Sequence, residues 1–207
     1  MPKVKGKKQS TLIDMTAMSD VTVLLLTFFI LTANFIPKEP VQLSTPASVS
    51  EIKIPEANRL MILIDPQGKV YLNLDRPITK MEVLKRVGKD YNITFTDKQI
   101  RSFVNQPNIG IDIRLLPKFL DMDMDDQDKA LRQYGVPADS TNNQLKIWVM
   151  NAVAVNKEIV GEDITIAIKS DKTTPYPKVK NVLSTLQDIK QNRYNLITSL
   201  EGMPAGF

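Results

Sequence analysis

Residues 15–36 read MTAMSDVTVLLLTFFILTANFI, and they form the longest apolar stretch of this 207-residue chain. As an α-helix, a segment of 22 residues extends over about 33 Å, which is enough to cross a hydrocarbon core of about 30 Å. Pro37 follows directly and favours the end of a helix. The pattern therefore predicts a single transmembrane helix over residues 15–36.

Lysines are distributed unevenly around this segment. Four precede it, namely Lys3, Lys5, Lys7 and Lys8. Only Lys38 and Lys53 follow within about 20 residues. The positive-inside rule then places residues 1–14 in the cytoplasm, as a basic tail, and the C-terminal bulk of the chain on the opposite side.

A cleaved signal peptide is the main alternative, because it also combines a lysine-rich start with an apolar core. Three features of the sequence argue against it: the apolar run is long, an aspartate lies within it, and no A-x-A cleavage site follows. We therefore favour a membrane anchor.

Asp20 is the only ionisable side chain between Met15 and Ile36. It lies roughly 7–8 Å from Met15 along the helix axis. A charged aspartate in hydrocarbon costs at least about 2–3 kcal/mol, so such residues usually face a partner helix or a water-filled cavity and often belong to proton relays. A simpler interpretation, in which Asp20 only marks the helix start in the headgroup region, stays open. The hydroxyl groups of Thr16, Ser19 and Thr27 are predicted to make polar contacts between helices.

The composition excludes several kinds of chemistry. The chain has no histidine and no cysteine, which removes the commonest general base, the commonest metal ligand and all thiolate sites. We therefore expect no enzymatic activity, no cofactor and no metal site. From residue 21 onward, 23 basic residues are balanced by 21 acidic ones, which does not favour nucleic-acid binding.

An acidic run, DMDMDDQD at residues 121–128, invites comparison with a calcium-binding loop. An EF-hand needs Gly at the sixth position and Glu at the twelfth, where this chain has Asp126 and Arg132. We interpret the run as the solvated start of a helix.

Residues 37–57 read as a linker, because they hold three further prolines and show no sustained periodicity. Within them, residues 41–43 (VQL) could pair as a short strand. We expect residues 58–207 to form an α+β domain with helices packed on one face of a mixed sheet.

The elements of this domain follow from local patterns. Strands are predicted at residues 61–64, 70–74, 164–168 and 196–198, with a turn at 65–68 (DPQG) between the first two. Thr79 and Glu82 suggest a capping box for a helix that uses Met81, Leu84 and Val87. Pro177 can open a second helix, whose apolar face would consist of Val179, Val182, Leu183, Leu186 and Ile189.

Residues 92–160 contain further helical patterns at 97–104, 127–134 and 144–155. The segment is too long and too apolar for a solvated loop, so we expect it to fold onto the core and to offer an additional contact surface.

The membrane segment and two later blocks resemble the ExbD/TolR biopolymer-transport family. In residues 13–31, Thr16 takes the family's threonine position and Asp20 that of its proton-carrying aspartate, followed by the Leu/Phe-rich run. Asp14 and Ala17 replace the usual Asn and Pro. Residues 59–87 are similar to the family's strand, D-x-x-G turn, strand and helix, and residues 164–199 to its strand, Asp-x-x-x-x-Tyr loop, helix and last strand. Residues 92–160 have no counterpart in this pattern and look like an insertion.

The resemblance implies a proton-motive-force-driven subunit of a bacterial inner-membrane motor, with residues 58–207 in the periplasm. Its implied partners are a polytopic ExbB/TolQ-like protein, a second copy of this chain and a TonB-like protein that serves outer-membrane transport. Two alternatives stay open: a TolR-like subunit for envelope integrity that binds peptidoglycan, and a membrane-anchored periplasmic adaptor without proton chemistry.

Overall fold

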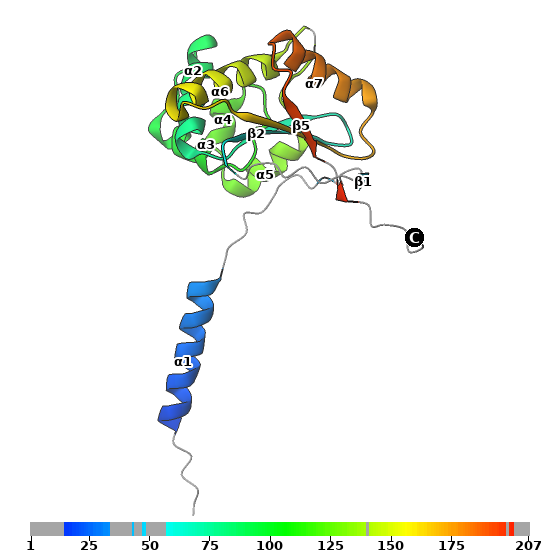
Figure 1. Ribbon diagram of the computed structural model, residues 1–207. Helices are drawn as coiled ribbons and strands as arrows, with labels where there is room; N and C mark the ends of the chain where they lie inside the picture. Colours follow the sequence, from blue (N-terminus) through cyan, green and yellow to red (C-terminus); the bar gives the residue numbers. More distant parts are fainter. Residues whose placement is uncertain are drawn as a thin grey trace, which may run out of the picture. The chain divides into compact units, whose positions relative to one another are not determined.

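The computed structural model describes residues 15–33, 43, 47–48, 57–139, 141–197 and 199–200. They belong to two compact units, Met1–Lys38 and Glu39–Phe207. We describe each unit by itself (Figure 1).

The first unit contains the helix α1, Met15–Thr32, which has 18 residues. Its large apolar side chains are exposed, from 54% of the surface of Leu25 to 85% of that of Leu31. Ala33 is already outside the helix, and residues 34–36 of the predicted span lie outside the described residues. Within the described part of the chain, no helix combines the length and the apolar character that a membrane crossing requires. The transmembrane span therefore stays a prediction.

The second unit is built around a mixed four-stranded sheet with the strand order β3-β2-β4-β5. Its strands are β2 (Arg59–Ile64), β3 (Val70–Leu74), β4 (Thr165–Ser170) and β5 (Tyr194–Ile197). β2 runs antiparallel to β3 and parallel to β4, and β4 runs parallel to β5. A separate two-residue parallel pair joins β1 (Ala47–Ser48) to β6 (Ser199–Leu200). The predicted α+β class and the mixed sheet are confirmed.

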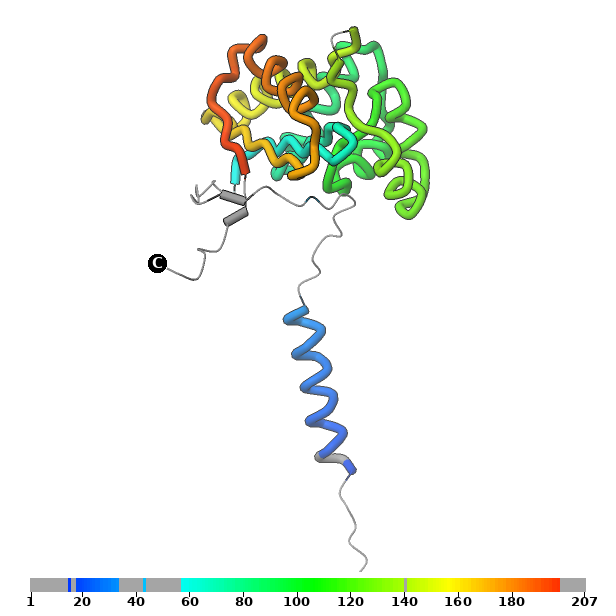
Figure 2. Tube along the Cα trace, turned by 90° about the vertical axis from the view of Figure 1, so that its right-hand side faces the viewer, coloured from blue at the N-terminus to red at the C-terminus, as the bar shows by residue number. Residues whose placement is uncertain are grey.

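Most helices of this unit lie between β3 and β4 in the chain, and the last one follows β4. They are α2 (Pro77–Asp90), α3 (Asp97–Asn105), α4 (Leu116–Leu120), α5 (Met124–Gln133), α6 (Gln144–Val160) and α7 (Tyr176–Asp188). The four central ones, α3 to α6, belong to residues 92–160, so that segment folds as predicted. Figure 2 shows its tube, in green and yellow, wound compactly against the rest of the domain.

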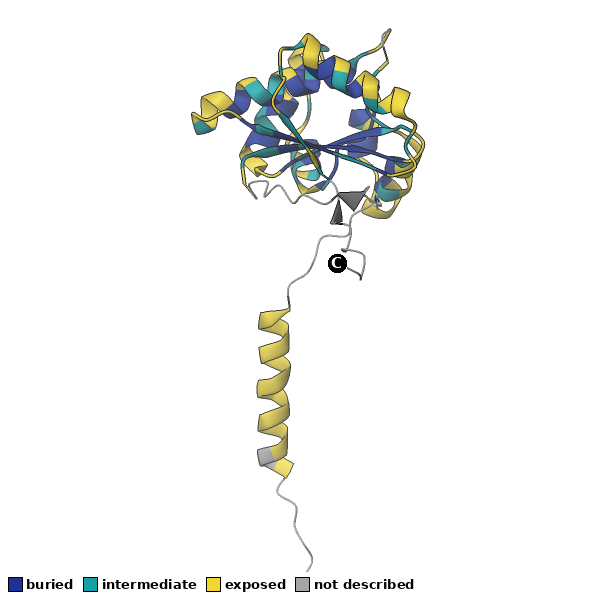
Figure 3. Ribbon diagram, turned by 45° about the vertical axis from the view of Figure 1, so that its right-hand side comes forward, coloured by how far each residue is buried: buried dark blue, intermediate teal, exposed yellow. Residues whose placement is uncertain are grey.

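The core joins one face of the sheet to buried side chains of the helices α2 to α7. Alternate residues of β2, Leu60, Ile62 and Ile64, are at most 1% exposed and point to the same face as Ile166 and Ile168 of β4. Buried side chains of all these helices join them in one cluster. Figure 3 shows the buried stretches of β2, β3 and β4 in dark blue, whereas β5 is intermediate to exposed. The predicted apolar face of α7 is confirmed, with Val182 and Leu186 buried and its other members partly buried.

The opposite face of the sheet is covered next to β3. Tyr71 points away from Val70 and Leu72, and its hydroxyl donates a hydrogen bond of 3.1 Å to the carbonyl of Leu131 in α5. A Cβ atom on Gly110 would lie 2.1 Å from the Tyr71 ring, so the close approach there requires glycine. The prediction of helices on one face alone was therefore incomplete, because α5 packs on the other face.

Residues 92–160 also cover the outer edge of the sheet. Leu72 of β3 exchanges two backbone hydrogen bonds with Ile109, of 2.7 and 2.8 Å, and Val136 donates one of 2.8 Å to the carbonyl of Val70. A strand edge with unpaired backbone groups tends to pair with other chains. These bonds give the outward-facing backbone groups of Val70 and Leu72 partners within the chain.

Several element boundaries differ from the predictions. The helix α2 begins at Pro77 after Arg76, with no side-chain cap, so the predicted capping box of Thr79 and Glu82 is wrong. The final strand begins two residues earlier than predicted, and its predicted last residue, Thr198, lies outside the described residues. The predicted strand at residues 41–43 also falls largely outside them, and Leu43 is not in a strand.

Candidate functional site

Asp20 lies in the second turn of α1 and is exposed in this chain. Thr27 follows it by seven residues, or about two turns, so both side chains leave the helix on nearly the same side. Thr16 lies one turn before Asp20, although its side chain is not among those that the structure describes. The remaining positions of α1 are mostly apolar all round, so Asp20 is the one group here that can carry charge.

The hydroxyl groups of α1 that the structure describes, those of Ser19, Thr22, Thr27 and Thr32, donate hydrogen bonds within the helix. Ser19 donates a hydrogen bond of 2.8 Å to the carbonyl of Met15, and Thr27 donates to the carbonyls of Val23 and Leu24 at 3.0 and 2.9 Å. A hydroxyl that donates to its own backbone still keeps its acceptor lone pairs. The predicted contacts of Ser19 and Thr27 with another helix therefore stay predictions.

In the second unit, two buried aspartates close the turns at the carboxyl ends of β2 and β4. Asp65 accepts hydrogen bonds from the backbone nitrogens of Gln67 and Lys69, at 2.9 and 2.7 Å, and Gly68 adopts a positive φ of 82°. This confirms the predicted D-x-x-G turn. The turn is a rigid link between β2 and β3.

Asp171 has the same role after β4. Its carboxylate accepts hydrogen bonds from the nitrogen and the hydroxyl of Thr173, at 2.9 and 2.6 Å. The hydroxyl of Thr174 donates to the carbonyl of Asp65 at 2.9 Å, which ties the two turns together. Both aspartates thus have structural hydrogen bonds that account for their burial.

Tyr71 and Lys80 are the titratable groups of this unit that burial changes most clearly. Burial raises the pKa of the Tyr71 phenol, and the negative charge of Asp65 raises it further. Burial lowers the pKa of the Lys80 amine, although Asp75 acts in the opposite direction. Neither residue stands out in the sequence, because only the packing of residues 92–160 buries them.

The acidic run at residues 121–128 forms the start of α5, as predicted. Asp123 is the N-cap, and Asp125 and Asp126 lie in the first turn, where negative charge favours the helix dipole. No group of three or more acidic residues in the described part of the chain is arranged to hold a metal ion.

The chain thus combines an apolar helix that carries a single acid with a separate α+β domain on a mixed sheet. The family model described as biopolymer transport protein ExbD/TolR matches residues 6–201, which is nearly the whole chain. The chain therefore belongs to the ExbD/TolR family, whose members are non-enzymatic subunits of biopolymer transport systems that work with ExbB/TolQ-type proteins. No curated protein and no solved structure matches this chain.

Proposed function

We propose that this protein is the proton-driven energy-transducing subunit of an inner-membrane motor of the ExbB–ExbD type, which energises TonB-dependent transport across the outer membrane. The observation that carries the proposal is the position of Asp20, the only ionisable side chain between Met15 and Ile36. An acid inside a membrane span marks a proton or ion pathway in many transport proteins.

The character of α1 supports this role. Its apolar side chains point in all directions and are left exposed by the other described residues of their unit. A helix that is hydrophobic all round needs lipid or other helices as its surroundings. We infer that residues 15–36 cross the inner membrane inside a ring of a polytopic ExbB/TolQ-like partner, side by side with the same helix of a second copy.

In this mechanism, each proton that moves down the gradient binds to the Asp20 carboxylate and then leaves it on the other side. The cycle drives relative movement of α1 and the ring, and residues 37–57 transmit this movement to the periplasmic domain at residues 58–207. One charge that crosses the field contributes about 2.3 kcal/mol per 100 mV. A few protons therefore suffice to shift a weakly bound domain on a TonB-like partner.

The test is the substitution Asp20→Asn, which keeps the size and the hydrogen-bonding capacity of the side chain but cannot cycle its charge. We expect the variant to insert and to copurify with its polytopic partner, yet to leave transport inactive, whereas Asp20→Glu retains partial activity. Asp14→Asn is the matched control and should be mild, because it lies before the span. Growth of the Asp20→Asn strain on a substrate that requires energised outer-membrane uptake would reduce the protein to an anchored adaptor.

The family description covers both ExbD-like and TolR-like subunits. A deletion strain separates them by phenotype. An ExbD-like role predicts loss of growth on such a substrate with a normal envelope, whereas a TolR-like role that includes peptidoglycan binding predicts detergent sensitivity and leakage of periplasmic proteins.

A further inference from the structure

A pocket with a volume of about 730 Å³ opens beside the start of β4, where the chain passes from α7 into β5. Pockets that bind small molecules typically have volumes of about 300–1,000 Å³. The lining consists of Val153 in α6, residues 163–165 at the start of β4, and residues 190–195. All of these residues belong to the described part of the chain. The segment 190–195 supplies most of the lining, so its conformation decides what the pocket can bind.

This segment is held at both of its ends. The backbone nitrogens of Lys190 and Gln191 donate hydrogen bonds of 2.9 Å to carbonyls in the last turn of α7, in the pattern of a Schellman motif. At the other end, Tyr194 and Asn195 belong to β5 and pair with β4. The polar side chains of the segment therefore extend from a fixed backbone, which favours a preformed binding site.

The backbone of Lys190 is strained. It adopts a positive φ of 59° at the position of the Schellman motif where glycine is usual. A residue with a Cβ atom is disfavoured in this left-handed conformation. Strained residues persist where the surrounding structure holds them, and they concentrate at binding and catalytic sites. The lysine at this position thus indicates a function for its side chain.

The charges of the lining are predominantly positive. Lys190 and Arg193 are its cations, and Asp163 is its one acidic residue. Asp163 forms an ion pair of 3.8 Å with Lys157 of α6, which lies outside the lining. Asp188, two residues before Lys190, also lies outside it. Neither Lys190 nor Arg193 makes an ion pair or a side-chain hydrogen bond with another described residue. The pocket therefore presents two unpaired positive charges to a ligand, which favours an anion.

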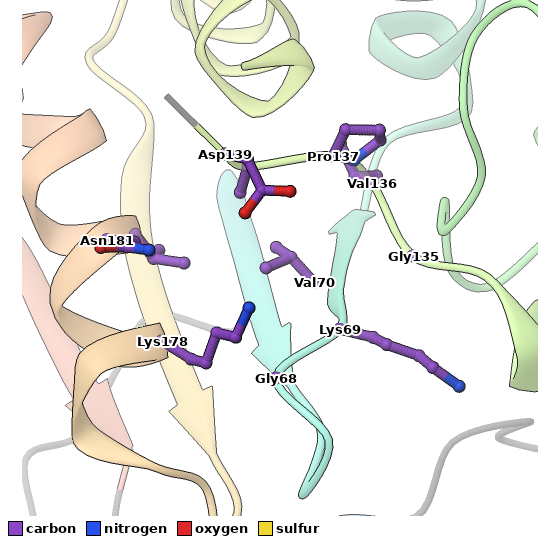
Figure 4. A pocket seen from close by; sticks show the side chains of 11 residues that line it. Gly68, Lys69, Val70, Gly135, Val136, Pro137, Asp139, Lys178 and Asn181 are labelled. Carbon is purple, nitrogen blue, oxygen red and sulfur yellow. The ribbon is translucent and has the colours of Figure 1, made fainter. Parts of the chain in front are cut away.

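A smaller pocket, of about 260 Å³ beside α7 and β3, has a different arrangement of charge (Figure 4). There the amine of Lys178 is directed toward the carboxylate of Asp139. Lys69 points away and donates a hydrogen bond of 2.7 Å to the carbonyl of Arg132. The facing charges of Lys178 and Asp139 oppose each other, so this smaller pocket does not select an anion. The pocket beside β5 differs because the partner of its acid lies outside the lining.

Uncharged polar side chains make up much of the remaining lining of the pocket beside β5. They are those of Gln191, Asn192, Asn195 and Thr165. Amide and hydroxyl groups both donate and accept hydrogen bonds, and none of these four side chains bonds to another described residue. Val153, Ile164 and the ring of Tyr194 add apolar surface. The hydroxyl groups of a sugar are also both donors and acceptors, and a sugar ring has an apolar C–H face, so this lining matches a sugar.

We propose that this pocket binds a sugar that carries a carboxylate, either as a free sugar acid or as one unit of an acidic glycan. Lys190 and Arg193 hold the carboxylate, to which a guanidinium can donate two parallel hydrogen bonds. The amides and Thr165 bind the ring hydroxyls, and Tyr194 contacts the ring. The site does not involve Asp20, so it goes beyond the proposed energy-transducing role and is tested independently of it.

The experiment measures the binding of matched probes to the purified full-length chain in detergent by isothermal titration calorimetry. Methyl galacturonoside and methyl galactoside share one ring and differ only in a carboxylate or a hydroxymethyl group, and acetate is a carboxylate without a ring. We expect the galacturonoside to bind on the order of tenfold more tightly than either of the others. Trigalacturonate distinguishes the two sources, because tighter binding than the galacturonoside supports a glycan and equal binding supports a free sugar acid.

Two substitutions remove the positive charges one at a time. Arg193→Gln and Lys190→Gly should each weaken galacturonoside binding on the order of fivefold and change galactoside binding by less than about twofold. Lys190→Gly should also keep or raise the urea midpoint, because glycine is favoured at a positive φ. Weaker binding by a chain of equal or higher stability separates a role in binding from a role in folding.

Arg101→Gln is the matched control, since it makes the same change at an exposed arginine outside the lining. It should leave the binding of every probe unchanged. Equal losses in Arg101→Gln and Arg193→Gln would overturn the proposal. Equal affinities for the galacturonoside and either the galactoside or acetate, or no binding of the galacturonoside at millimolar concentration, would overturn it as well.

Discussion

Lys80, in the first turn of α2, donates a hydrogen bond of 2.8 Å from its Nζ atom to the main-chain carbonyl oxygen of Gln106, just beyond the end of α3. A second, longer contact of 3.4 Å reaches the carbonyl of Val104. Lys80 is only 8% exposed. A cation is favourable at the C-terminus of a helix, where carbonyl groups lack partners within the helix. This lysine therefore attaches the end of α3, within residues 92–160, to α2.

The substitution Lys80→Met tests this attachment. It keeps most of the aliphatic stem but leaves the buried carbonyl of Gln106 and the partly buried carbonyl of Val104 without this donor, so we expect a loss of about 1–3 kcal/mol in the free energy of unfolding. Urea unfolding of the full-length chain, followed by the fluorescence of the single tryptophan, Trp148, measures it. Trp148 is a suitable probe because it is 1% exposed and stacks on Phe103 of α3.

Lys85→Met is the control for this prediction, because Lys85 lies on the same helix and is exposed. Its effect should stay within about 0.5 kcal/mol. Equal unfolding midpoints for the two variants would contradict a role of Lys80 in holding the segment.

A second prediction concerns alkaline pH. The pKa of Tyr71 is raised in the folded state, so above the ordinary tyrosine pKa of 10.0 the unfolded chain releases this proton first. The contribution of Tyr71 to stability is therefore complete below pH 10.0 and is lost as the pH rises above it. Tyr71→Phe should lose about 1 kcal/mol near neutral pH, through the missing hydrogen bond to Leu131, but should decline less at alkaline pH.

Urea midpoints of the wild type and of Tyr71→Phe at about pH 8 and about pH 11 measure this difference. Tyr134→Phe is the matched control, because Tyr134 is 45% exposed. An identical alkaline decline of the wild type and Tyr71→Phe would show that the Tyr71 phenol is not protected by folding.

A third prediction compares two threonines near helix starts. Thr96 accepts a hydrogen bond from the backbone nitrogen of Gln99 at 3.3 Å, and the side chain of Gln99 accepts one from the nitrogen of Thr96 at 3.0 Å, which completes a capping box for α3. Thr96→Ala should cost about 1 kcal/mol. Thr79, by contrast, has a buried hydroxyl with no partner among the described residues, so Thr79→Val should be neutral or stabilising. Urea unfolding of both variants shows whether Thr96→Ala lowers the free energy of unfolding more than Thr79→Val does.

These two threonines also show where sequence reasoning reached its limit. Thr79 and Glu82 have the spacing of a capping box, and Thr96 and Gln99 have the same spacing. Only the second pair caps a helix, because Pro77 opens α2 two residues before Thr79 and places it inside the first turn. The competing signal was in the sequence, since proline is favoured at the first helical position.

Local patterns predicted the strands β2, β3 and β4 and three helices of residues 92–160, namely α3, α5 and α6, because alternation and helical periodicity report burial directly. They missed the five-residue helix α4, which is too short to show a period, and the start of α5, which lies three residues before the predicted one. They could not predict that Ile109 and Val136 would pair with β3, or that Tyr71 would reach α5. The pocket that Asp139 and Lys178 line was missed for the same reason. These two residues are far apart in sequence and neither belongs to a recognisable motif, so only the fold brings them together.

The last prediction concerns the arrangement of α1 in the motor proposed above. Ser19 and Thr27 satisfy their donors within the helix, so Asp20 is the polar group of α1 that most needs a partner. If two copies lie side by side, one face of each helix contacts the other. Single cysteines at positions 21–33, introduced into a chain that has no native cysteine, should then give self-crosslinks that are strong at every third or fourth position and weak between. The pattern should persist in Asp20→Asn, because that variant is expected to assemble normally and to lose only the proton cycle. Crosslinks of equal strength at all positions would indicate random collision, and their complete absence would exclude a paired arrangement of α1.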